Sequence, residues 1–220
     1  MKYKFFFTML TFCSLIFFNN PLAHSKTDAL VKEVHLPLYS SQFNINKFYQ
    51  QTDYGLKIRP EYARQTKKIK HQETQIKFKG PPLFGYDYFQ PTTQYLPIGY
   101  FTHDNYFYRL IIYTTYGESD TELLNLQLNS YDKHGQLIDT IILDSQYYYE
   151  DVSSYTKFRI NPDMTIKLTK YITYYYSDDY GYGDERGLIK NPQPKKYIQE
   201  KYQIHKGHFN LISSKKYIDV

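Results

Sequence analysis

The sequence predicts a mainly β protein, an antiparallel up-and-down meander that forms an open barrel or a sandwich, with one short N-terminal helix. The strongest pattern lies in residues 106–143, where polar and apolar side chains alternate with the period of two that a strand requires. Turn residues recur at intervals of about ten to fifteen residues. The chain shows no self-similarity at the period of about 34 to 45 residues typical of solenoids and propellers, and no helical pattern alternates with its strands.

The first residues have the layout of a secretory signal. Two lysines precede an apolar run over 5–18, and polar residues follow it. Small side chains before Lys26 predict cleavage after Ser25, so 1–25 is interpreted as a signal peptide and 26–220 as a single β-rich domain. The alternative is an uncleaved N-terminal anchor. With the signal removed, no transmembrane segment is expected, and the protein is predicted to be exported, periplasmic or extracellular.

The composition of the mature chain excludes several kinds of chemistry. The only cysteine, Cys13, lies in the signal, so disulfides and thiolate chemistry are not expected after cleavage. The formal net charge of +5 includes two lysines of the signal, which leaves about +3 and argues against nucleic acid as a partner. The chain has 27 Tyr, 15 Phe and no Trp. Either this reflects a Tyr-rich recognition surface, or it reflects an A+T-rich gene and the preference of Tyr for strands.

The N-terminal part of the domain is expected to hold the one helix. Ser40 or Ser41 can cap a short helix that ends before Gly55 and is too short to be stable unless it packs against the sheet. Three apolar residues of this helix share one face: Ile45, Phe48 and Tyr49.

Two further stretches precede the meander. Basic residues accumulate over 57–79, either as a surface for anions such as lipid headgroups or acidic polysaccharide, or as a solvated face with a strand at 75–79. The segment 83–102 is rich in aromatic residues and interrupted by Pro and Gly. It is interpreted as an ordered connection with one or two short strands, which forms a wall of a pocket or covers one end of the core.

The meander over 106–143 is predicted to contain three strands with turns at Gly117 and Gly135. The central strand places its leucines on a core face and its amides on a face exposed to water: Leu124, Leu126 and Leu128 against Asn125, Gln127 and Asn129.

The later strands are predicted from the same alternation of residues and from turn residues. Phe158 and Ile160 point inward from 155–160, and 164–176 is the longest strand. Lys170 interrupts its inner face, which a bulge or a solvent-lined edge would explain. Residues 177–194 read as a loop, and the closing strands 195–205 and 208–218 turn at Lys206-Gly207.

Motifs for catalysis are absent, including G-x-S-x-G, H-E-x-x-H, the phosphate-binding loop and the dinucleotide fingerprint. No cofactor is predicted. His205 and His208 flank a turn, as a metal pair or as two exposed histidines. The loop after the longest strand has four carboxylates of the kind that Ca²⁺ prefers, although their spacing is not that of a Ca²⁺ loop and a solvated acidic loop is the favoured interpretation: Asp178, Asp179, Asp184 and Glu185.

Two aromatic runs are the candidate binding residues: Tyr147, Tyr148 and Tyr149, and Tyr174, Tyr175 and Tyr176. Alternate residues of a strand face opposite sides, so at least one Tyr of each run is expected outside the core, near the acidic loop. The sequence therefore favours an exported, non-enzymatic envelope protein that binds a macromolecule, possible partners being an envelope protein or a polysaccharide. The alternative is a small-molecule carrier or a hydrolase with dispersed carboxylates in the mouth of a barrel, with 83–102 as a lid.

Overall fold

A computed structural model describes residues 31–52, 55–69, 79–80, 94–116, 121–149, 151–177, 179–180 and 183–217. The predicted signal and the turn at Gly117 lie outside these residues, as do most of 75–79 and the first part of 83–102. The strands of the N-terminal part are β1 (Lys32–Glu33), β2 (Leu38–Tyr39), β3 (Tyr49–Thr52), β4 (Gly55–Ile58) and β5 (Lys67–Lys68). The long strands are β6 (Gln94–His103), β7 (Tyr106–Tyr116), β8 (Glu122–Tyr131), β9 (Leu137–Tyr149), β10 (Val152–Ile160), β11 (Thr165–Tyr174), β12 (Lys195–His205) and β13 (His208–Lys216).

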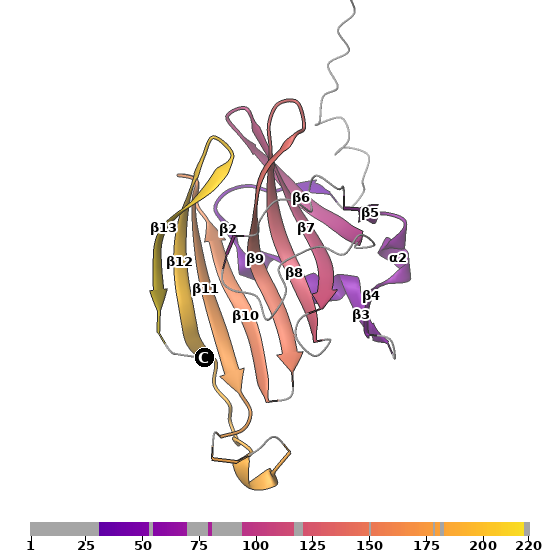
Figure 1. Ribbon diagram of the computed structural model, residues 1–220. Coiled ribbons are helices and arrows are strands. Elements are labelled where there is room, and N and C mark those ends of the chain that lie inside the picture. Colours follow the sequence, from indigo (N-terminus) through magenta and orange to yellow (C-terminus); the bar gives the residue numbers. More distant parts are fainter. Residues whose placement is uncertain are drawn as a thin grey trace, which may run out of the picture.

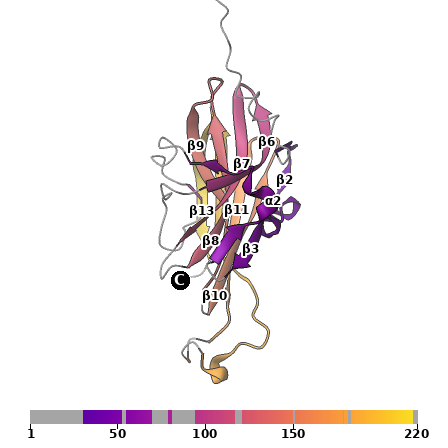
Figure 2. The ribbon, with the colours of Figure 1, turned by 90° about the vertical axis from the view of Figure 1, so that its right-hand side faces the viewer.

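An 11-stranded, mainly antiparallel sheet forms the body of the protein, and its long strands β6 to β13 follow one another in chain order. Three short strands complete the sheet: β1 precedes β6 on this path, while β5, which also pairs with β6, and β2, which pairs with β10, lie off it. The sheet is not closed, which confirms an open meander of the predicted class. The views in Figures 1 and 2 show the strands curling so that β6 to β9 and β10 to β13 form the two halves of one curved body.

One core lies between these halves. It contains buried side chains from every long strand and from the N-terminal segment, among them Leu110, Leu126, Phe158, Leu168 and Phe209. Because both halves bury apolar side chains in the same cluster, removal of water from this shared interior is the main force that keeps the open sheet curled.

The predicted short helix is present, but as 3₁₀ helix in two pieces, η1 (Ser40–Gln42) and η2 (Ile45–Phe48). Phe43 is extended between them, and Tyr49 already begins β3. Asn and Phe are poor helix formers, so this sequence supports single turns rather than a regular α-helix. The three apolar residues assigned to one face are nevertheless all buried.

The hairpin turns use the expected backbone conformations. Gly135 and Gly207 have φ angles of 77° and 79°, which confirms the turns predicted at both positions. Met164, after the Asn161-Pro162-Asp163 turn, has φ 61° although its side chain is only 4% exposed. Its packing in the core therefore offsets the strain of a left-handed non-glycine residue.

The prediction of a wet face on β8 is wrong. Asn125, Gln127 and Asn129 are 0%, 0% and 2% exposed. Asn125 Nδ2 donates to Thr115 Oγ1 (2.8 Å), and the hydroxyl of Tyr113 donates to Gln127 Oε1 (2.6 Å). The amides can be buried because they bond to one another and to these neighbours on β7.

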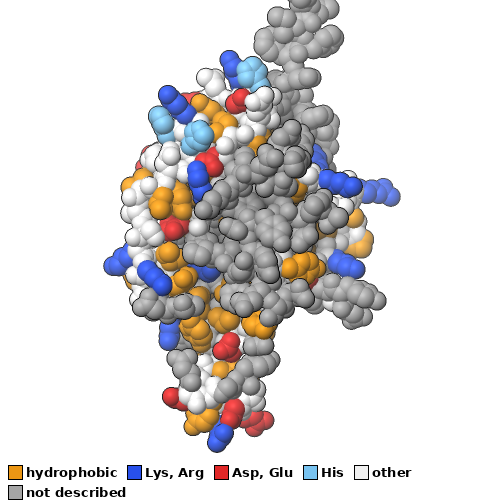
Figure 3. Space-filling model, viewed as in Figure 1, with side chains coloured by type: hydrophobic (Ala, Val, Ile, Leu, Met, Phe, Trp, Pro, Cys, Tyr) orange, Lys and Arg blue, Asp and Glu red, His pale blue; other side chains and the backbone are white. Residues whose placement is uncertain are grey.

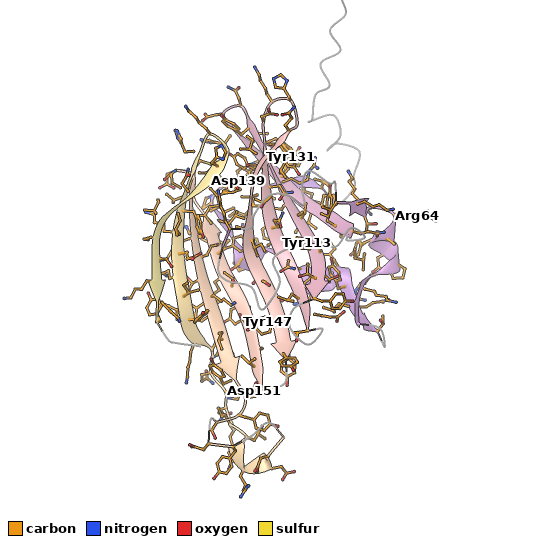
Figure 4. The ribbon with its side chains drawn as sticks, viewed as in Figure 1. Arg64, Tyr113, Tyr131, Asp139, Tyr147 and Asp151 are labelled. Carbon is orange, nitrogen blue, oxygen red and sulfur yellow. The ribbon has the colours of Figure 1, made fainter. Side chains whose placement is uncertain are left out.

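This polar ladder continues along β8. Gln127 Nε2 donates to Asn129 Oδ1 at 2.6 Å, and Asn129 Nδ2 donates to the hydroxyl oxygen of Tyr131 at 3.1 Å. Figure 4 shows Tyr113 and Tyr131 at different heights on this pair of strands, so the ladder runs along the sheet rather than across it.

Asp139 joins the two halves at the upper end of the sheet (Figure 4). Its carboxylate accepts from the backbone N–H groups of Phe209 and Thr140, each at 2.9 Å, and pairs with the ammonium of Lys79. Asp139 therefore fixes the start of β13 against β9 where no ladder of backbone bonds joins these two strands. Lys79, one of the basic residues of 57–79, is therefore paired with a carboxylate of the protein itself.

Candidate functional site

The two predicted tyrosine runs lie at the same end of the molecule. One run ends β9, and the other begins at Tyr174, the last residue of β11. The rings of Tyr148 and Tyr175 have centroids 5.4 Å apart. Ser153 Oγ and the hydroxyl of Tyr175 are hydrogen-bonded at 3.0 Å. Tyr148 is 65% exposed whereas Tyr147 is 8% exposed, so alternate residues of the run do face opposite sides.

The outward side of β10 and β11 continues from this end as one strip. We call it the tyrosine–lysine face and define it by Tyr148, Tyr155, Lys157, Arg159, Lys167, Tyr171 and Tyr175. Tyr155 and Tyr171 are cross-strand partners, and their rings stack with centroids 5.3 Å apart at an interplanar angle of 13°. The Lys157 ammonium lies 5.9 Å and 5.2 Å from the two ring centroids.

Positive charge dominates this face. Arg159 is paired in the sheet with Lys167 and covers the ring of Tyr39, 5.1 Å from its centroid. The register extends the same rows onto β12 and β13, with Lys201 beside Lys167 and Lys215 beside Gln199. These described rows contain no Asp or Glu. The positive potentials of their Lys and Arg side chains therefore add up, and the face attracts anions.

A cavity of about 770 Å³ adjoins the tyrosine–lysine face. It lies at the hairpin end of β9 and β10, and Tyr148 and Tyr155 belong to both the cavity and the face. The N-terminal segment and three strands line it: Asn46, Leu56, Thr121, Glu122, Leu124, Gln146, Tyr147, Tyr148, Tyr149, Ser154 and Tyr155. Glu122 holds the edge of the cavity because both its carboxylate oxygens accept from the Leu56 N–H at 2.7 Å.

Two buried ionisable residues, Asp144 and Lys170, lie near this cavity and influence each other electrostatically. Asp144 Oδ1 accepts from the Thr156 N–H at 2.6 Å, and Oδ2 accepts from Gln146 Nε2 at 2.6 Å. Lys170, 5% exposed, lies between the rings of Tyr147 and Tyr197. The predicted bulge at Lys170 is confirmed, but the side chain is buried rather than placed at a solvent-lined edge.

Burial shifts both groups away from their ordinary titration. Desolvation raises the pKa of Asp144 to about 6, although its hydrogen bonds and the charge of Lys170 act in the opposite direction. Desolvation lowers the pKa of Lys170 to about 8, which the nearby carboxylate of Asp144 partly counteracts.

The acidic loop does not bring its carboxylates together in the part that is described. Asp184 caps the 3₁₀ turn η5 (Glu185–Gly187) and forms a fork with Arg186, whose Nη2 is 2.6 Å from Oδ2. These bonds hold the pKa of Asp184 below its ordinary value. Asp179 and Glu185 are exposed, and Asp178 lies outside the described residues. No group of three or more His, Cys, Asp or Glu in the described ranges could hold a metal ion.

The same loop is nevertheless folded back on itself. Tyr176 and Leu188 form an isolated bridge, and the Ser177 N–H donates to the Gly187 carbonyl at 2.9 Å. Figures 1 and 2 show this segment extending below the sheet, and Figure 3 shows acidic, basic and apolar side chains interspersed on it. The described part of this loop forms a short extension beside the tyrosine runs.

His205 and His208 pair across the β12–β13 turn, and both are exposed. His208 Nδ1 is 3.7 Å from the Asp139 carboxylate, which already accepts three other donors. Imidazoles gather at this upper end (Figure 3), far along the sheet from the tyrosine runs.

Tyr155, Tyr171 and Lys157 were not among the predicted binding residues. The alternation of β10 contained a usable signal, since inward Phe158 and Ile160 require Tyr155, Lys157 and Arg159 to point outward. Their partnership with Tyr171 depends on the register between β10 and β11.

Comparisons of the chain with protein-family models, curated proteins and solved structures find no match. Within the described residues, no helix has the length and apolar character needed to cross a membrane.

Proposed function

We propose that this chain is an exported, non-enzymatic protein that binds an acidic polysaccharide of the cell envelope through the tyrosine–lysine face. The observation that supports this most is the stacked pair of Tyr155 and Tyr171 with the Lys157 ammonium over both rings. A ring pair with cations at its border suits a polymer that has both apolar sugar faces and anionic groups.

The length of the face supports a polymer as the ligand. Tyr175 and Tyr171 are four residues apart on the chain, which places their rows about 13 Å apart along an extended strand. Arg159 and Lys167 lie further along in the other direction. A ligand that contacts both aromatic positions and both cations must therefore be extended, as a polysaccharide chain is.

The cavity contributes a place for one sugar unit or a side branch next to this strip. Its polar groups include the Asn46 and Gln146 amides, which are hydrogen-bonded to each other at 3.1 Å. Glu122 is the one carboxylate among its described lining residues. Glycoside hydrolysis uses a pair of carboxyl groups across the bond to be cleaved, so this lining favours binding over hydrolysis.

Binding to immobilised polygalacturonate tests the proposal, with neutral dextran and duplex DNA as competing ligands. We expect polygalacturonate to bind, neutral dextran not to bind, and Lys157→Glu to weaken binding at least tenfold. Lys133→Glu is the matched control, because it makes the same charge change at an exposed turn residue. Equal affinity for DNA and polygalacturonate would show that the face attracts any polyanion.

A second experiment separates aromatic contact from charge. Tyr155→Ala leaves the net charge unchanged and is expected to weaken polygalacturonate binding severalfold. Tyr116→Ala, at an exposed Tyr outside the face, is the control. Unchanged binding in Tyr155→Ala would contradict a role for the ring pair.

The size of the cavity supports a second candidate function, a carrier of a small molecule. The carrier function predicts that galacturonate monomer binds as tightly as the polymer and that Asn46→Ala weakens both. The polysaccharide function predicts that the monomer binds far more weakly, since it cannot contact the whole face.

A further inference from the structure

A second cavity, of about 440 Å³, lies between the N-terminal segment and β6. It shares no lining residue with the cavity beside the tyrosine–lysine face. Its volume is within the range of about 300–1,000 Å³ that small-molecule sites occupy.

The interior of this second cavity is apolar. Leu38, Phe48 and Ile98 are 2%, 7% and 7% exposed and form its floor. Val34 and Phe43, both half-buried, complete the walls. The Val34 N–H donates to the Tyr100 carbonyl at 2.8 Å, which holds the N-terminal segment against β6.

The rim of the cavity is polar and positively charged. Lys32 and Lys47 are exposed lining residues, and the Lys47 ammonium is 4.7 Å from the centroid of the Phe48 ring. This places a cation directly above the apolar floor. His35, Gln42 and Asn44 complete the rim, and no described lining residue is acidic.

We propose that this cavity binds a single-chain anionic amphiphile, with its alkyl chain on the apolar floor and its carboxylate between Lys32 and Lys47. The floor alone would accept any apolar group, but two lysines in a described lining that contains no carboxylate select an anionic head. A cationic or neutral head of the same chain length would leave these ammonium groups without a counterion. This proposal does not rest on polysaccharide binding, because the two cavities share no lining residue.

Calorimetric titration of the full protein with decanoate, decanol and decyltrimethylammonium tests this inference. We expect decanoate to bind at least tenfold more tightly than decanol and decyltrimethylammonium not to bind measurably. Equal affinity for decanoate and decanol would overturn the assignment of an anionic head, and binding of the cation would do the same.

Two variants locate the site. Lys32→Glu/Lys47→Glu should weaken decanoate binding at least tenfold, whereas Lys133→Glu/Lys157→Glu, an equal charge change elsewhere, should leave it unchanged. Val34→Trp, which fills the wall of the cavity, should weaken decanoate binding while near-UV circular dichroism shows that the fold is retained. Full decanoate affinity in both cavity variants would show that the amphiphile binds elsewhere and would refute the proposal.

Discussion

The contribution of the buried residues Asp144 and Lys170 to the free energy of unfolding should be lowest between about pH 6 and pH 8. Burial raises the pKa of Asp144 to about 6 from an unfolded value of 3.8. Between these values the folded chain binds a proton that the unfolded chain has lost, so stability falls as pH rises. Burial lowers the pKa of Lys170 to about 8 from 10.5. Between those values the unfolded chain retains the extra proton, so stability rises with pH.

The size of the effect follows from the shifts. The pKa of each group is shifted by about two units, and one unit corresponds to about 1.4 kcal/mol. The free energy of unfolding should therefore fall by about 3 kcal/mol on the acid side and rise by about 3 kcal/mol on the alkaline side. This is a large fraction of the roughly 5–15 kcal/mol by which native proteins are stable. The pKa of Asp163 and of Asp184 is lowered by hydrogen bonds, and such groups lose their contribution as pH falls. The two effects oppose each other in acid, so the comparison must be made between variants.

The assay is urea unfolding of the native chain, Asp144→Asn, Lys170→Met and the double variant at pH 4.5, 7 and 9.5. Lys170→Met should remove the alkaline rise. It should also move the acid limb toward neutral pH, because the Lys170 ammonium lowers the pKa of Asp144. Relative to the native chain, the free energy of unfolding of the double variant should increase most at pH 7.

Lys167→Met is the control, since Lys167 is exposed on the outward side of the same strand. Its effect on the unfolding free energy should be small and independent of pH. If the difference between the native chain and Lys170→Met is the same at all three pH values, Lys170 titrates normally and the reasoning is refuted.

Three further predictions concern other positions. Asp139→Ala should lower the free energy of unfolding by about 3 kcal/mol, because the buried Phe209 N–H loses its acceptor; urea unfolding measures this, with an unchanged midpoint contradicting it. Gly187→Ala should make the loop over 177–194 sensitive to proteases without changing the unfolding midpoint, since its Cβ would lie 2.6 Å from the Tyr180 Cβ. Millimolar Ca²⁺ should leave the melting temperature unchanged, because Arg186 already occupies the Asp184 carboxylate; a rise of several degrees that Asp184→Ala abolishes would show a calcium site.

The alternation of residues along single strands could be interpreted from the sequence, but the environment of each face could not. The leucines of β8 are in the core as predicted, whereas Gln127 and Asn129 are buried against expectation. Their burial depends on donors and acceptors such as Tyr113 and Tyr131, which the fold brings close. A period of two identifies two faces, and it contains no information on what covers the polar one.

The residues of the candidate site could be predicted from the sequence only in part, for the same reason. The sequence predicts that at least one Tyr of each run lies outside the core, because alternate residues of a strand face opposite sides, and Tyr148 is such a residue in the first run. The stacking of Tyr155 on Tyr171 requires the nine-pair register between β10 and β11, which starts beside the turn in which Met164 has a positive φ angle. Cross-strand neighbours are set by such turns, and one residue more or less would place a different side chain beside Tyr155.

The separation of β9 from β10 explains why Asp144 and Lys170 are buried near each other. These strands pair at only three positions near their hairpin, and β9 then follows β8 with an irregularity between Ile142 and Asp144. The Thr156 N–H consequently has a carboxylate as its acceptor, Asp144 Oδ1, in the place of a backbone carbonyl. A carboxylate in this interior favours a nearby cation, which Lys170 supplies. Asn at position 144 would keep an acceptor for the Thr156 N–H but remove the charge. Asp144→Asn therefore tests whether the separation of β9 from β10 depends on this hydrogen bond or on the charge of Asp144.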